Sequence, residues 1–120
     1  MTTLQVGKEG ELLATVFLKN QGYKIIDRNF RIRGGEIDIV AIDKETLVYV
    51  EVKTRRSHSF GYPEEAVGPR KINFLKRAAK FYRNNRQHLN LPALERIDVV
   101  AVDLIDLQNP QYKLIQNAEF

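Results

Sequence analysis

Two short apolar stretches of the chain carry charged residues at positions where a sheet normally buries hydrocarbon. The first is Gly35–Val40, with the sequence Gly-Glu-Ile-Asp-Ile-Val, and the second is Tyr49–Lys53, with the sequence Tyr-Val-Glu-Val-Lys. Both are rich in residues that favour strands. Three carboxylates and a lysine interrupt these strands. Any fold of the chain therefore has to give these charged side chains a partner or contact with solvent.

The polar segment 43–46 between the two stretches predicts a hairpin. A turn centred on Lys44-Glu45 places Asp38 opposite Glu51 and Glu36 opposite Lys53. Since side chains alternate along a strand, all four then point to one face. The other face is expected to be core, and it carries Ile37, Ile39, Ala41, Val48, Val50 and Val52.

Facing carboxylates destabilise a strand pair by a few tenths of a kcal/mol up to about 1 kcal/mol. A hard cation reverses this effect, because Mg²⁺ is bound by one or two carboxylates together with phosphate oxygens and water. The alternative is a solvated hairpin face on which Glu36 and Lys53 form a surface ion pair. The two charged motifs in facing register favour a site for Mg²⁺ or Mn²⁺ with Asp38 and Glu51 as ligands.

The wider pattern resembles the bacterial YraN family, which is similar to Holliday-junction resolvases within the PD-(D/E)xK nuclease superfamily. One departure from the superfamily pattern is Ile37, where proline is common. The resemblance runs from about Gly7 to Val102. The motifs that carry it are Gly10-Glu11 with Ala14, Gly22-Tyr23, Arg28-Asn29, Gly35–Asp38, Val50–Arg55, Gly61, Pro63–Val67 and Lys71.

The resemblance implies an α/β protein with a three-layer α/β/α, restriction-endonuclease-like core and a mixed sheet. It also implies a metal-dependent endonuclease that hydrolyses DNA, selecting branched or junction structures in repair or recombination. In that hypothesis the main-chain carbonyl of Val52 joins Asp38 and Glu51 as a metal ligand. Lys53 positions or deprotonates the attacking water, or stabilises charge on the phosphate.

Two further carboxylates are assigned to the same site. Glu36 is expected to orient Lys53 or to support the ligands. The resemblance to resolvases suggests Glu11 as an additional carboxylate beside the metal, whereas a glutamate near a helix start is also explained by the helix dipole alone. Asp98 and Asp103 are poorer candidates, because no partner carboxylate falls in register with them.

Helical and strand periodicities predict the order α-β-β-β-α-β(-β) in one domain over residues 1–120. The helices are expected from about Lys8 to Asn20 and from Pro69 to Asn84 or Asn85. The expected strands are 23–32, the two arms of the hairpin, 96–103 and a short edge strand at 112–116.

Basic residues around the hairpin are expected to contact the DNA backbone. In the irregular stretch 54–68, Phe60 and Tyr62 could stack on bases or fold back onto the core, and His58 is expected to be a solvent-exposed residue. Lys71 is expected at a helix start, where free N–H groups also attract anions. The predicted nucleic-acid contacts are Arg33, Arg55, Arg56, Arg70 and Lys71.

The chain has no cysteine, which excludes disulfides, Cys-ligated zinc and thiol nucleophiles. It shows neither a signal-peptide pattern nor an apolar run long enough for a membrane span, so a cytoplasmic protein without a membrane partner is expected. The net charge of +4 permits an anionic partner. DNA is the expected partner, and a homodimer stays open because resolvases cut two strands symmetrically.

Two readings from other functional classes stay open. A nuclease fold that binds nucleic acid without cutting it would share every basic feature and would differ at the metal. An assembly factor for a larger repair complex would act through the edge near Leu104–Ile115.

Overall fold

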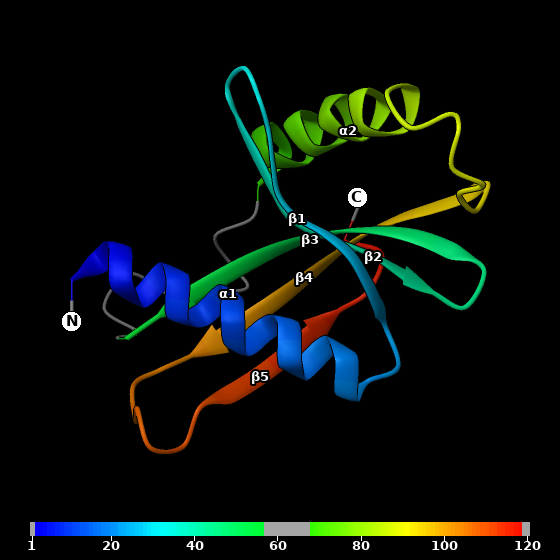
Figure 1. Ribbon diagram of the computed structural model, residues 1–120. Coiled ribbons are helices and arrows are strands. Elements are labelled where there is room, and N and C mark those ends of the chain that lie inside the picture. Colours follow the sequence, from blue (N-terminus) through cyan, green and yellow to red (C-terminus); the bar gives the residue numbers. More distant parts are fainter. Residues whose placement is uncertain (1, 57–67, 119–120) are drawn as a thin grey trace.

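The computed structural model describes residues 2–56 and 68–118 as an α/β protein built on one mixed sheet (Figure 1). The strand order is β1-β2-β3-β4-β5, in which β3 and β4 are parallel and the other neighbours antiparallel. The elements are α1 (Thr3–Asn20), β1 (Lys24–Ile32), β2 (Gly35–Asp43), β3 (Thr46–Arg55), α2 (Pro69–Asn84), β4 (Leu94–Asp103) and β5 (Gln111–Ile115). The predicted fold class and element order are confirmed, with β5 present.

The two helices begin for different reasons. α1 begins well before Lys8, because the Thr2 hydroxyl accepts the Gln5 N–H and the Gln5 side chain accepts the Thr2 N–H. This capping box satisfies two N–H groups that a helix start leaves open, and the sequence prediction missed it. α2 begins as predicted, with Gly68 as the N-cap and Pro69 in the first turn.

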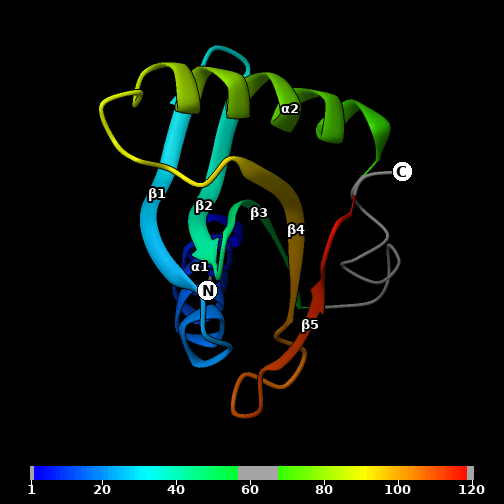
Figure 2. The same cartoon turned by 90° about the vertical axis from the view of Figure 1, so that its right-hand side faces the viewer.

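The helices cover opposite faces of the sheet, so the three-layer arrangement is also confirmed (Figure 2). Each face has its own buried apolar cluster. The cluster under α2 includes Ile37, Val40, Leu47, Tyr49, Leu75, Tyr82 and Ile97. The cluster under α1 includes Leu18, Ile39, Ala41, Val48, Val50, Val52, Val100 and Val102.

The hairpin register is as predicted over part of its length. β2 pairs with β3 from Asp43↔Thr46 to Ile39↔Val50, and the tight turn uses a positive φ of 56° at Lys44. Before Ile39, the described partner of β2 is β1, and the two form a ribbon that extends past the sheet towards α2 (Figure 1). Two-stranded ribbons twist strongly. The predicted face of Ile37 is therefore wrong, because the twist carries this side chain into the cluster under α2.

In the middle of β4 a buried carboxylate joins three parts of the chain. Asp98 is fully buried, and its oxygens accept hydrogen bonds from the Tyr23 hydroxyl, the Arg96 guanidinium and the Asn117 N–H. The Gln116 side chain donates in turn to the Tyr23 hydroxyl. Because both oxygens of Asp98 accept hydrogen bonds within the fold, its role is structural, which agrees with its being a poorer site candidate.

Within the described residues, neither helix has the length and hydropathy that a bilayer crossing requires.

Candidate functional site

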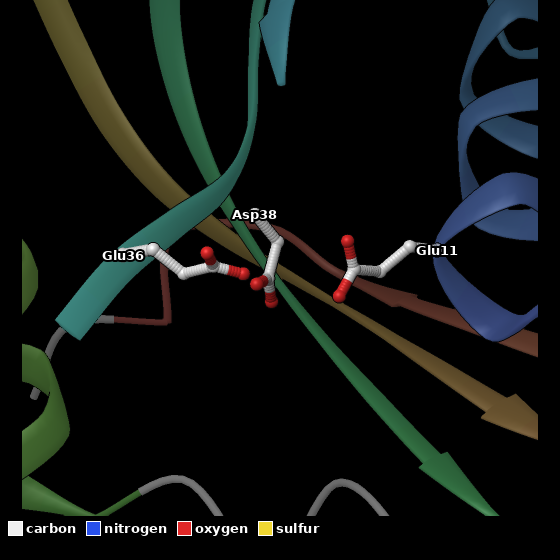
Figure 3. Close-up of side chains that lie close together, drawn as sticks. All are labelled: Glu11, Glu36 and Asp38. Atoms are coloured by element: carbon white, nitrogen blue, oxygen red, sulfur yellow. The ribbon is translucent and has the colours of Figure 1, made fainter. Parts of the chain in front are cut away.

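Three carboxylates from two elements converge where β2 leaves β3. Glu11 comes from α1, and Glu36 and Asp38 come from β2 (Figure 3). One carboxylate oxygen from each residue lies within 4.8 Å of one from each of the others. The structure therefore brings together three of the residues that the sequence analysis assigned to the site.

Asp38 sits at the point where the two central strands separate. Its Oδ2 atom accepts the Val52 N–H at 2.8 Å, just beyond the last described pair of the hairpin, Ile39↔Val50. A side chain thus accepts an N–H that β2 main chain would have accepted had pairing continued. This hydrogen bond fixes the carboxylate beside the Val52 backbone, and Asp38 is only 6% exposed.

Glu11 reaches the cluster because α1 lies very close to β3. A Cβ atom at Gly10 would fall 1.9 Å from Thr54 Oγ1, so only glycine fits at this crossing. The close approach sets the position of the next residue, Glu11, above the sheet. Glu11 thus lies beside Glu36 and Asp38, and its role as an additional carboxylate beside a metal stays a prediction.

Asn29 connects two of the acids, and the sequence analysis assigned it no role. Its Nδ2 atom donates to Glu11 Oε1 at 2.7 Å and lies 3.3 Å from Glu36 Oε1. The backbone of Asn29 has a positive φ of 54°, a conformation that Asn tolerates better than most residues. The role of Asn29 could not be predicted from the sequence, because it depends on contacts with Glu11 and Glu36, which lie in other segments of the chain.

Glu51 lies outside the group of three and has a different partner. It is 4% exposed, and its Oε2 atom lies 2.9 Å from Lys71 Nζ at the start of α2. Lys71, predicted as a nucleic-acid contact, therefore forms an ion pair with a predicted metal ligand. Joint metal ligation by Asp38 and Glu51 stays a prediction.

Burial governs the electrostatics of the cluster. It raises the pKa of Asp38, and the Val52 hydrogen bond and the positive charge of Lys71 oppose that rise. Burial likewise raises the pKa of Glu11, against the hydrogen bond from Asn29. Carboxylates with raised pKa values are held in a site that disfavours their charge, and a bound cation relieves this.

The donor set fits a hard divalent cation. Among the described residues, no donor hydrogen-bonds the buried oxygens Glu36 Oε2 and Glu51 Oε2, although each has a cationic neighbour. Arg31 Nε lies 3.1 Å from the first and Lys71 Nζ 2.9 Å from the second, as ion pairs without hydrogen-bond geometry. Unused lone pairs on carboxylates are the ligands that Mg²⁺ and Mn²⁺ prefer.

Lys53 lies two residues after Glu51 on β3, so the two side chains share the α2 face of the sheet. Its positive charge lowers the pKa of Asp38, which places the ammonium within electrostatic reach of the cluster. The predicted pairing of Glu36 with Lys53 is absent from the described register. Glu36 instead pairs across the β1–β2 ribbon with Arg31, in main-chain register and as an ion pair.

The predicted nucleic-acid contacts lie around one end of the sheet. Arg33 is exposed in the turn between β1 and β2, Arg70 is exposed in the first turn of α2, and Arg55 and Arg56 end β3 and begin the next segment. The Arg55 guanidinium donates to the carbonyl of Thr54. The predictions for His58, Phe60 and Tyr62 lie outside the described residues.

The sequence profile of the family described as "Uncharacterised protein family UPF0102" matches residues 10–102. The chain belongs to this family. The predicted resemblance to YraN proteins is thereby confirmed, since UPF0102 is the same family. The UPF0102 match spans the whole acidic cluster, from Glu11 in α1 to Asp38 in β2.

Several UPF0102 proteins are similar to this chain over most of its length. One from Geobacter sulfurreducens is 45% identical over 113 residues, covering 94% of this chain and 87% of the relative. One from Caldicellulosiruptor saccharolyticus is 43% identical over 120 residues, covering 98% and 99%. One from Paenarthrobacter aurescens is 53% identical over 97 residues, covering 81% and 78%. These names state no reaction, so the chemistry has to follow from the site.

Proposed function

We propose that this UPF0102 protein is a metal-dependent endonuclease that hydrolyses phosphodiester bonds in DNA, with branched DNA as its expected substrate. The observation that carries the proposal is the convergence of Glu11, Glu36 and Asp38 within 4.8 Å, with Asp38 buried. Three carboxylates this close repel one another, and a fold keeps them so placed when a cation or a positively charged ligand binds there.

The residues that would hold Mg²⁺ or Mn²⁺ are Asp38 with Glu11 and Glu36, together with Glu51 and the Val52 carbonyl as the sequence predicts. Such an ion supplies Lewis-acid polarisation of a phosphate and lowers the pKa of a bound water. The acidic oxygens without hydrogen bonds provide the acceptor capacity that this requires.

Two lysines near the cluster have roles that follow from their charge. Lys53, on the same face of β3 as Glu51, would hold the attacking water or stabilise negative charge developing on the phosphate. Lys71 neutralises Glu51 in the structure described, and its Nζ is close enough to the cluster to lower the pKa of Asp38. Both cations favour an anionic substrate beside the acids.

A calorimetric titration with Mn²⁺ tests the metal directly. We expect the wild type to bind the ion and Asp38→Asn to bind at least ten-fold more weakly. An asparagine oxygen can still accept the Val52 N–H, so the variant should fold. Glu45→Gln is the matched control, because Glu45 is exposed in the β2–β3 turn, away from the cluster. Equal Mn²⁺ affinity in Asp38→Asn and Glu45→Gln would contradict the metal site.

Cleavage assays test the reaction. Wild type with Mg²⁺ or Mn²⁺ should cut branched or linear DNA, and Glu51→Gln and Lys53→Ala should lose this activity while their melting temperatures stay close to that of the wild type. Lys44→Ala removes an exposed lysine from the turn and should cut normally. Residual nicking at the same level in all variants would show that the activity belongs to a contaminant.

The Lys71–Glu51 ion pair favours one competing function, a module that binds nucleic acid without cutting it. In that case a lysine, not a metal ion, neutralises the buried Glu51 carboxylate. The Mn²⁺ titration separates the two functions, since a module would bind DNA undiminished and take up no metal. Sedimentation with and without branched DNA would show whether two copies assemble, as symmetrical incision requires.

A further inference from the structure

A groove with a volume of about 600 Å³ runs between the first half of α1 and the β1–β2 ribbon. Two carboxylates of the acidic cluster, Glu11 and Glu36, line its wall. The other lining residues that matter here are Lys8 and Leu12 from α1, and Arg28 and Arg31 from β1. The groove therefore connects the surface to the carboxylates.

Three cations line the groove together with these carboxylates. Lys8 and Arg28 are exposed, and within the described residues neither side chain forms a hydrogen bond or ion pair. Arg31 is 82% exposed and touches Glu36 Oε2 through Nε, which leaves its other nitrogens towards solvent. Cations beside a carboxylate cluster match a ligand that carries several negative charges.

The size and lining of the groove indicate which form of nucleic acid fits. Its volume falls in the range of about 300–1,000 Å³ typical of sites for small ligands, which suits a short run of one strand and not a duplex. None of the described residues that line it is aromatic, so it offers no stacking platform for bases. Binding would come from phosphate contacts and would be insensitive to sequence.

We propose that this groove holds a single strand of nucleic acid, with Lys8, Arg28 and Arg31 on consecutive phosphates and the strand passing from them to the acidic cluster. This inference rests on the proposed function, because it assigns the path by which the substrate reaches that site. It also gives a physical basis for selecting branched DNA, which presents unpaired strands at its junctions or flaps.

The test measures binding apart from cleavage. A fluorescently labelled single-stranded oligonucleotide is titrated with the whole protein in EDTA, by anisotropy, at several salt concentrations. The groove variant is Lys8→Gln/Arg28→Gln. The matched control is Lys80→Gln/Arg77→Gln, which removes the same two charge types from exposed positions on α2, across the sheet. Melting curves verify that both variants fold.

For single strands the dependence of log K on log salt has a slope of about −0.7 for each neutralised phosphate. We expect the groove variant to bind about ten-fold or more weakly at low salt and to lose about 1.4 of this slope, with the control close to wild type. Equal losses in the two variants, wild-type binding by the groove variant, or tighter binding of duplex than of single strand by the wild type would overturn the proposal.

The outcomes for groove and reaction are independent. If the groove variant loses binding while the wild type cuts no DNA with Mn²⁺, the groove stands and the nuclease proposal fails. If the wild type cuts DNA and the groove variant binds and cuts as well as the control, the nuclease proposal stands and the strand path is wrong.

Discussion

The crossing of α1 over β3 at Gly10 makes a quantitative prediction about how the cluster is held. A Cβ atom at this position would lie 1.9 Å from Thr54 Oγ1 and 2.8 Å from Thr54 Cβ. The Thr54 backbone is fixed by its pairing with Val102 in β4, so α1 has to move outward in Gly10→Ala. Overpacking of this kind destabilises a protein by about 1–3 kcal/mol.

Gly7→Ala is the internal control for this substitution. Gly7 also lies in α1, but a Cβ atom there has no heavy atom within 4 Å. Replacing a helical glycine by alanine stabilises by up to about 1 kcal/mol, and this gain applies to both sites. The difference between the two variants therefore isolates the steric effect, which should be about 1–3 kcal/mol in the free energy of unfolding.

Thermal unfolding, supported by urea titration, measures this difference. For a chain of this length 1 kcal/mol corresponds to roughly 4 °C, so Gly10→Ala should melt about 4–12 °C below Gly7→Ala. Adding Thr54→Ala to Gly10→Ala should recover part of the loss, since it removes the nearest atom. Equal melting temperatures for the two single variants would refute the close crossing and the positioning of Glu11 that depends on it.

Three further predictions concern buried groups. Asp98→Ala should destabilise by about 1–3 kcal/mol in a urea titration, because the Tyr23 hydroxyl and the Asn117 N–H lose a buried acceptor while Arg96 keeps its ion pair with Asp43; a loss below about 1 kcal/mol would contradict the structural role. Because burial raises the pKa of Asp38 above 3.8, the native state holds this proton more tightly than the unfolded state, and wild-type stability in EDTA should fall as the pH rises from about 4. Asp38→Asn should show a smaller fall, because Glu11 keeps its raised pKa, and should be more stable than the wild type at pH 7 in EDTA; a less stable variant there would count against the buried charge. Burial raises the pKa of Tyr23 from 10.0 to about 12, so the free energy of unfolding should also fall as the pH rises from 10 to 12. This fall should be less steep in Tyr23→Phe, and an equal fall in the variant and the wild type would contradict the prediction.

The parts of the fold that were predictable are those that local pattern determines. Alternation of apolar and polar residues identified the hairpin, and the turn fixed its register from Asp43↔Thr46 to Ile39↔Val50. Pro69 marked the start of α2. The same reasoning extended the ladder past Ile39↔Val50, to Asp38 opposite Glu51 and Glu36 opposite Lys53, because nothing in a local pattern shows that the Asp38 side chain accepts the Val52 N–H.

The candidate site was predictable as a set of residues and not as a set of contacts. Glu11, Glu36 and Asp38 lie together, and the sequence analysis had assigned all three to the site. The role of Asn29 depends on a positive φ, and the partner of Glu51 depends on where α2 begins in space. Both are contacts between segments far apart in the chain, which single-sequence periodicity does not encode.

The buried Asp98 centre has a consequence for how the protein matures during synthesis. Tyr23 follows the first helix, yet its hydroxyl contacts a carboxylate 75 positions later and the side chain of Gln116, 93 positions later. A nascent chain can form the hairpin early, but the hydrogen bonds around Asp98 cannot be completed until residues 116–118 have left the ribosome. In a stalled or shortened product Asp98 and Tyr23 would lack their contacts with Asn117 and Gln116, so this part of the sheet would open more readily than in the full chain.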